Sequence, residues 1–147
     1  MTAQSSPATV LAFDFGARRI GVAVGNTLTR VAQPLTTLDC DRDNERFAAI
    51  AALLDEWQPD MLVVGIPVHA DGAAHAMTAQ ARRFARELVE RFRLPVKLAD
   101  ERWTTQLAQT ALDEAGAGGR KGRAIRDQVA AQMILQGWFD DRDAADT

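Results

Sequence analysis

The short segment Met61–Ile66 constrains the fold of this chain more than any other part of the sequence. It is wholly apolar and β-branched in character, which is typical of a strand buried on both faces. Apolar residues recur at helical spacing on either side of it, from Phe47 to Trp57 and from Met77 to Phe92. A buried strand between two amphipathic helices predicts an α/β fold with parallel strands.

The N-terminal third has a different pattern, with strands and short turns only. Val10–Phe15 and Ile20–Gly25 favour two strands joined through a turn at Gly16, and therefore a hairpin. A third strand is expected within Val31–Leu38, where Pro34 indicates a sheet edge or a bulge. This part of the sheet is expected to be antiparallel.

The C-terminal part continues the strand and helix alternation. Val96–Ala99 predicts a strand, Thr104 could begin a helix that ends near Gly116, and a last helix is expected over Ala124–Phe139. The glycine-rich stretch Gly116–Gly122 predicts a mobile loop. The whole pattern predicts an α/β fold with a mixed five-stranded sheet, in which three antiparallel strands precede two parallel crossover strands, and helices on both faces.

The 147 residues, 47% of them hydrophobic, suffice for one core and one domain. We expect a disordered tail at 1–9, the domain at 10–139 and an acidic tail at 140–147. A net charge of −3 argues against indiscriminate coating of nucleic acid but permits a locally basic face. One cysteine and two histidines exclude an internal disulfide and the usual four-ligand zinc site. No leader-like or membrane-spanning pattern is visible, so we expect a cytoplasmic protein without a membrane partner.

Two acids lie where apolar residues are expected. Asp14 interrupts the first strand, and its ordinary explanation is an exposed strand end or a cap on the following turn. Asp127 lies between Ile134 and Trp138 on a helical projection, which places it on the face turned toward the protein. Its ordinary explanation is a half-buried carboxylate in the first turn, stabilised by the helix dipole.

Asp100 and Glu101 directly follow the predicted strand Val96–Ala99, at the end where open α/β sheets usually bind ligands. Asp100 could instead cap the next helix. Carboxylates that converge repel one another unless a cation lies between them. Mg²⁺ or Mn²⁺ prefers oxygen ligands and could activate water for phosphodiester cleavage.

Four motifs occur in the order seen in one family: LAFDFGARRIGVAVGN, VVGIPVHADG, LADERWTT and KGRAIRDQVAAQMILQGWF. Over residues 10–139 the chain thus resembles the YqgF/RuvX family of proposed Holliday junction resolvases. The resemblance implies a ribonuclease H-like fold and a divalent-metal endonuclease, acting either on the 5′ end of pre-16S rRNA or on Holliday junctions.

The resemblance also implies that Asp14, Glu101 and Asp127 are the catalytic and metal-binding acids. Related resolvases carry a catalytic glutamate at the end of the strand that corresponds to Met61–Ile66, where this chain has Gly65, Ile66 and Pro67. In this chain the corresponding acid would be Glu101, which follows the next strand, Val96–Ala99. With the usual strand order, the backbone of that strand lies about 10 Å from the first strand. Asp100 remains the alternative metal ligand or a supporting residue.

Basic residues next to the proposed acids could form a rim that binds phosphate, although each is explained as well by a solvated surface position. They are Arg18, Arg19, Arg102, Arg120, Lys121, Arg123 and Arg126. Trp103 could stack on a base or simply pack, whereas Trp57 and Trp138 lie on core-facing helix stripes. His69 is expected to be a solvent-exposed loop residue.

The leading hypothesis is a Mg²⁺ or Mn²⁺ endonuclease that uses water as its nucleophile on precursor rRNA or branched DNA. The first alternative is an ATP-binding phosphotransferase of the actin and sugar-kinase type, which the single hairpin and the short chain disfavour. The second is a nucleic-acid-binding scaffold without catalysis. A homodimer would suit a four-way junction, but no sequence stripe identifies its interface.

Overall fold

The computed structural model describes residues 8–16, 18–40, 42–66, 72–100 and 119–146. In this part of the chain five strands form one sheet in the order β3-β2-β1-β4-β5. The pairing is antiparallel for β1 with β2 and for β2 with β3, and parallel for β1 with β4 and for β4 with β5. The strands are β1 (Thr9–Asp14), β2 (Arg19–Asn26), β3 (Gln33–Asp39), β4 (Met61–Ile66) and β5 (Val96–Asp100). This is the mixed sheet that the sequence predicts.

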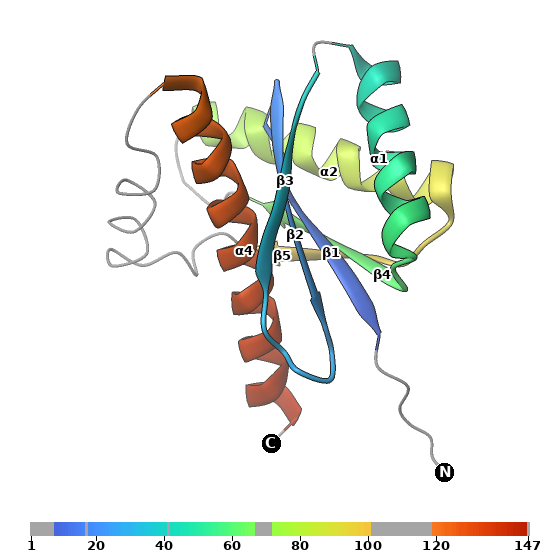
Figure 1. The fold of residues 1–147 in the computed structure, drawn as a ribbon. Helices are drawn as coiled ribbons and strands as arrows, with labels where there is room; N and C mark the ends of the chain where they lie inside the picture. The colour runs from blue at the N-terminus through green and yellow to red at the C-terminus, as the bar shows by residue number, and fades with distance from the viewer. Residues whose placement is uncertain (1–7, 17, 41, 67–71, 101–118, 147) are drawn as a thin grey trace.

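Helices cover both faces of the sheet, as expected (Figure 1). Helices α1 (Asp43–Trp57) and α2 (Gly72–Phe92) pack on one face, and α4 (Gly119–Asp146) packs on the other. The helix predicted from Thr104 to Gly116 lies outside the described residues. No helix in the described ranges is long and apolar enough to cross a membrane.

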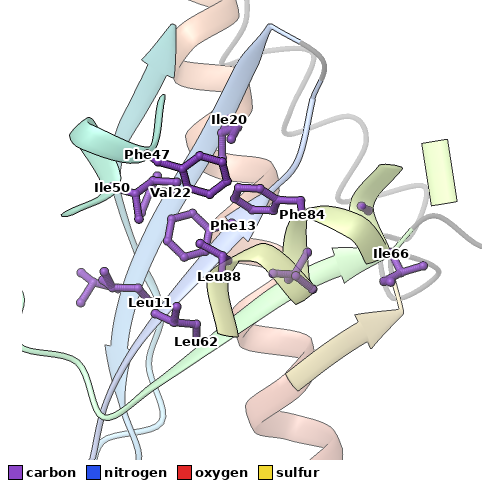
Figure 2. Packing of buried hydrophobic residues seen from close by; sticks show 14 residues of the cluster. Leu11, Phe13, Ile20, Val22, Phe47, Ile50, Leu62, Ile66, Phe84 and Leu88 are labelled. Atoms are coloured by element: carbon purple, nitrogen blue, oxygen red, sulfur yellow. The ribbon is translucent and has the colours of Figure 1, made fainter. Parts of the chain in front are cut away.

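The strand alternation divides the core into two clusters, one on each face of the sheet. On the α1 and α2 face, side chains such as Leu11, Phe13 and Val22 pack against Phe47 and Phe84 (Figure 2). The rings of Phe13 and Phe84 meet edge to face, with their centroids 5.9 Å apart. The partly buried Trp57 packs against this cluster, which confirms its predicted packing role.

On the α4 face, the intervening residues Val10, Ala12 and Ala23 pack against the apolar stripe of α4. Trp138 is buried there, as the helical projection predicts. The small side chains of Ala12 and Ala23 allow the helix to lie close to the sheet. This close approach positions the candidate site described below.

Leu135 tests how much of the stability comes from the packing of α4. It is fully buried in the α4 cluster, so Leu135→Ala should lower the free energy of unfolding by about 3 kcal/mol. Ile125 lies on the same helix but is exposed, and Ile125→Ala should cost about 0.5 kcal/mol. Urea denaturation followed by circular dichroism measures both values, and equal losses would contradict this account of the core.

Two expectations about helix α4 are wrong. The helix begins at Gly119 instead of Ala124, so the second half of the predicted glycine loop, Gly119–Gly122, is helical. Gly122 is buried, which shows that packing overrides the low helix propensity of glycine here. The helix also continues to Asp146, past the end predicted at Phe139.

The third strand confirms the interpretation of Pro34. Strand β3 forms the edge of the sheet, and its pairing with β2 shifts register between Val22 and Ala23, opposite Pro34. The hydroxyl of Thr37 on β3 donates a hydrogen bond to the carbonyl oxygen of Ala124, 2.6 Å away. This bond ties the sheet edge to the N-terminal half of α4.

Candidate active site

Asp14 is the last residue of the central strand β1 and is half-buried. Val10 and Ala12, four and two residues earlier, belong to the core cluster under α4. Because side chains alternate along a strand, Asp14 occupies the next position on the α4 face. The strand therefore directs a carboxylate toward the helix that carries Asp127.

Gly21 brings the two acids together. It pairs directly with Asp14 across the β1–β2 hairpin. A Cβ atom added at Gly21 would overlap the carbonyl oxygen and carbon of Asp127, so the backbones of β2 and α4 are in contact there. Asp14 and Asp127 are thus neighbours of one glycine, although they lie near opposite ends of the sequence. Sequence analysis missed Gly21, whose signal is a glycine inside an apolar strand.

Asp127 is bonded to Arg19, which lies on the same face of β2 as Gly21. The Arg19 Nε atom donates a hydrogen bond to Asp127 Oδ2 at 2.7 Å, and the two side chains are only 31% and 19% exposed. Asp127 thus faces the protein, as the helical projection predicts.

The expected role of the helix dipole at Asp127 is wrong. Helix α4 begins at Gly119, so Asp127 lies about two turns after the helix start instead of in the first turn. The dipole effect fades within the first turn of a helix. The charge of Asp127 is therefore balanced by Arg19 and not by the dipole.

The third acid cannot be placed, because Glu101 lies outside the described residues together with Arg102 and Trp103. Asp100 is the last residue of β5 and pairs with Ile66 of β4. The strand order confirms that β5 is two strands away from β1, as the expected separation of about 10 Å requires. Ala99 of β5 belongs to the core cluster under α4, on the same face as Asp14.

The basic residues differ in their surroundings. Arg18 is exposed, and its Nε atom donates to Asp39 Oδ1 at 3.0 Å. Arg126 is exposed on α4, one residue before Asp127. The backbone positions of Arg120, Lys121 and Arg123 lie in the first turns of α4 instead of in a loop. Their roles in binding nucleic acid stay predictions.

Among the described residues, no group of three or more His, Cys, Asp or Glu side chains comes together as a metal site. Two of the three predicted acids, Asp14 and Asp127, do lie around Gly21. Carboxylate oxygens are the donors that Mg²⁺ and Mn²⁺ prefer, and the Asp127 carboxylate already binds a cationic group, that of Arg19. The donors therefore fit a divalent cation.

A mixed five-stranded sheet in the order β3-β2-β1-β4-β5, with helices on both faces, defines a ribonuclease H-like fold. The comparison with solved structures supports this fold. A RuvC of Thermus thermophilus, solved with a Holliday junction substrate, aligns with a TM-score of 0.63 and 16% identity over 92% of this chain and 96% of that chain. A fowlpox virus resolvase, solved with Holliday junction DNA, aligns with a TM-score of 0.53 and 8% identity over 91% and 98%.

The sequence comparison identifies the family. Residues 8–141 match the family model described as "RuvX: Holliday junction resolvase", so the chain belongs to the RuvX family. A relative from Nitrosomonas europaea, named "Putative pre-16S rRNA nuclease", is 57% identical over 95% of this chain and 94% of its own length. A relative of the same name from Chromobacterium violaceum is 56% identical over 88% of this chain and 96% of its own length.

Proposed function

We propose that this protein is a divalent-metal-dependent endonuclease that hydrolyses phosphodiester bonds in structured nucleic acid. The observation that carries the proposal is the convergence of Asp14 and Asp127 on Gly21, from opposite ends of the sequence. An apolar sheet face has no structural need for two carboxylates at one place. The family match favours this function over an ATP-binding phosphotransferase and over a scaffold without catalysis.

In this proposal Asp14, Glu101 and Asp127 hold Mg²⁺ or Mn²⁺. Asp100 is the less suited alternative to Glu101, because it directly follows Ala99 on β5 and strand alternation gives these two positions opposite faces of the sheet. A bound divalent ion would lower the pKa of a water molecule and stabilise negative charge on the phosphate. The protein supplies rigid positions for the acids, because Asp14 ends a central strand and Asp127 lies on a helix packed against that strand. A strand and a helix that are packed together keep the oxygen ligands in place before the substrate binds.

The basic residues are proposed to bind the phosphates on both sides of the cut bond. Arg18 and Arg126 are exposed and lie one residue from Arg19 and Asp127, respectively. The sequence motifs add four further basic residues to the proposed phosphate-binding set: Arg102, Arg120, Lys121 and Arg123. Trp103 is proposed to stack on a base. A basic rim on a protein of net charge −3 would restrict binding to this one face.

Precursor rRNA is the first substrate to test, and branched DNA is the second. The relatives that are 50% to 57% identical carry the rRNA nuclease name, whereas the junction-bound structures are at most 16% identical and support the fold alone. An rRNA substrate would place the protein in the cytoplasm. A homodimer remains a proposal that sedimentation with and without a four-way junction would test.

The wild-type protein should cleave one of these substrates in Mn²⁺ or Mg²⁺ and neither of them in EDTA. A side-by-side assay would use a precursor 16S rRNA 5′ fragment, a four-way DNA junction and unstructured strands of equal length. Faster cleavage of the rRNA fragment supports rRNA processing, and faster cleavage of the junction supports resolution. Cleavage that persists in EDTA would contradict the proposed metal dependence.

A further inference from the structure

Arg19 forms a short ion pair with Asp127, one of the proposed metal ligands. The bond from its Nε atom to Asp127 Oδ2 measures 2.7 Å, and both side chains are largely shielded from water. Arg18 makes a similar bond to Asp39 at 3.0 Å, but there the side chains are 61% and 37% exposed. The ion pair of Arg19 is thus shielded from solvent, whereas that of its neighbour Arg18 is exposed to it.

The ion pair between Arg19 and Asp127 lies close to a second carboxylate-bearing residue, Asp14. Gly21, two residues after Arg19 on the same face of β2, pairs with Asp14 and contacts the backbone of Asp127. Two carboxylates in a partly buried place repel each other unless a cation is near. Arg19 supplies a positive charge at this place without any metal ion.

We propose that Arg19 is the internal counter-cation of the acid pair, and that a divalent ion competes with it for the Asp127 carboxylate. This inference rests on the proposed function, because it takes the acids to be metal ligands. Arg19 then stabilises the protein without metal and lowers its affinity for metal. This role differs from the phosphate binding predicted for Arg19 from the sequence, because its guanidinium group is bonded to Asp127.

Arg19→Gln should therefore have two effects in opposite directions. In EDTA its melting temperature should fall by several degrees, because the acids lose their counter-charge. Its affinity for Mn²⁺ should rise by about tenfold, because a positive charge next to the ion has been removed. Arg19→Lys retains the charge and should bind Mn²⁺ as the wild type does.

Thermal denaturation in EDTA and in Mn²⁺, together with calorimetric titration of Mn²⁺, measures both effects without any cleavage assay. Arg83→Gln is the matched control and should change neither quantity, because Arg83 is exposed and pairs with Glu87 on helix α2, on the other face of the sheet. Adding Asp127→Asn to Arg19→Gln should restore the melting temperature in EDTA, which a purely steric role for Arg19 would not produce.

Mn²⁺ binding by Arg19→Gln that is equal to or weaker than wild-type binding would overturn the inference. Equal melting temperatures of Arg19→Gln and Arg83→Gln in EDTA would overturn it as well. If the wild type binds no Mn²⁺, the metal-dependent function fails, and the EDTA comparison with the double variant still decides whether Arg19 is a counter-cation.

Discussion

Asp14→Asn will reduce metal-dependent cleavage by about 10³-fold or more, since it removes a charged ligand from the centre of the proposed site. Asparagine has nearly the same shape, so the half-buried position at the end of β1 tolerates it. The folded structure should therefore persist while cleavage is lost. Single-turnover cleavage of the preferred substrate in Mn²⁺ measures this loss.

The control for this experiment is Asp60→Asn, beside the opposite end of β1. Asp60 is exposed, and its Oδ2 atom accepts a hydrogen bond from the backbone nitrogen of Thr9 at 2.9 Å. Its replacement should leave cleavage unchanged. Glu101→Gln and Asp127→Asn should reduce cleavage about as much as Asp14→Asn does. Full cleavage activity in all three variants would contradict the assignment of these acids as metal ligands.

Gly21→Ala will destabilise the protein by about 3 kcal/mol and strongly reduce cleavage. The added methyl group would overlap the backbone of Asp127, and no side-chain rotation relieves a clash with backbone. Helix α4 must move away from β2, which separates Asp127 from Asp14. Urea denaturation measures the stability, and Mn²⁺ titration of the folded protein measures the damage to the site.

Gly25→Ala on the same strand separates the loss of stability from the loss of the site. Its added Cβ atom would lie 2.8 Å from the Phe139 ring and 2.9 Å from the Val31 carbonyl oxygen. Neither contact is easily relieved, because Phe139 is buried and the Val31 carbonyl belongs to the backbone, so the expected cost is about 2 kcal/mol. Mn²⁺ binding should persist, because neither neighbour is one of the acids. A Gly21→Ala protein as stable as the wild type would contradict the close packing of β2 against α4.

The sheet could be predicted from the sequence because its signals are local. The apolar run Met61–Ile66 coincides with β4, and Pro34 marks the sheet edge and the register shift as expected. Helix α4 was predicted less well, since glycines favour loops in isolation. The burial of Gly122 depends on tertiary packing, which local composition does not report.

The site could be predicted only in part, for a similar reason. Asp14 and Asp127 are conspicuous because each interrupts an apolar pattern. The pairing of Arg19 with Asp127 joins residues 108 positions apart and depends on the contact at Gly21. A local pattern could suggest only the helix dipole as the partner of Asp127, whereas the folded chain supplies a distant arginine.

The origin of the two acids also matters for biosynthesis. Asp14 belongs to the first strand and Asp127 to the last helix, so a nascent chain carries the first acid long before the second has left the ribosome. Contacts between such distant segments form only after the intervening chain is available. The two acids of the proposed catalytic centre therefore cannot come together until α4 has been synthesised, and a shorter chain lacks the second of them.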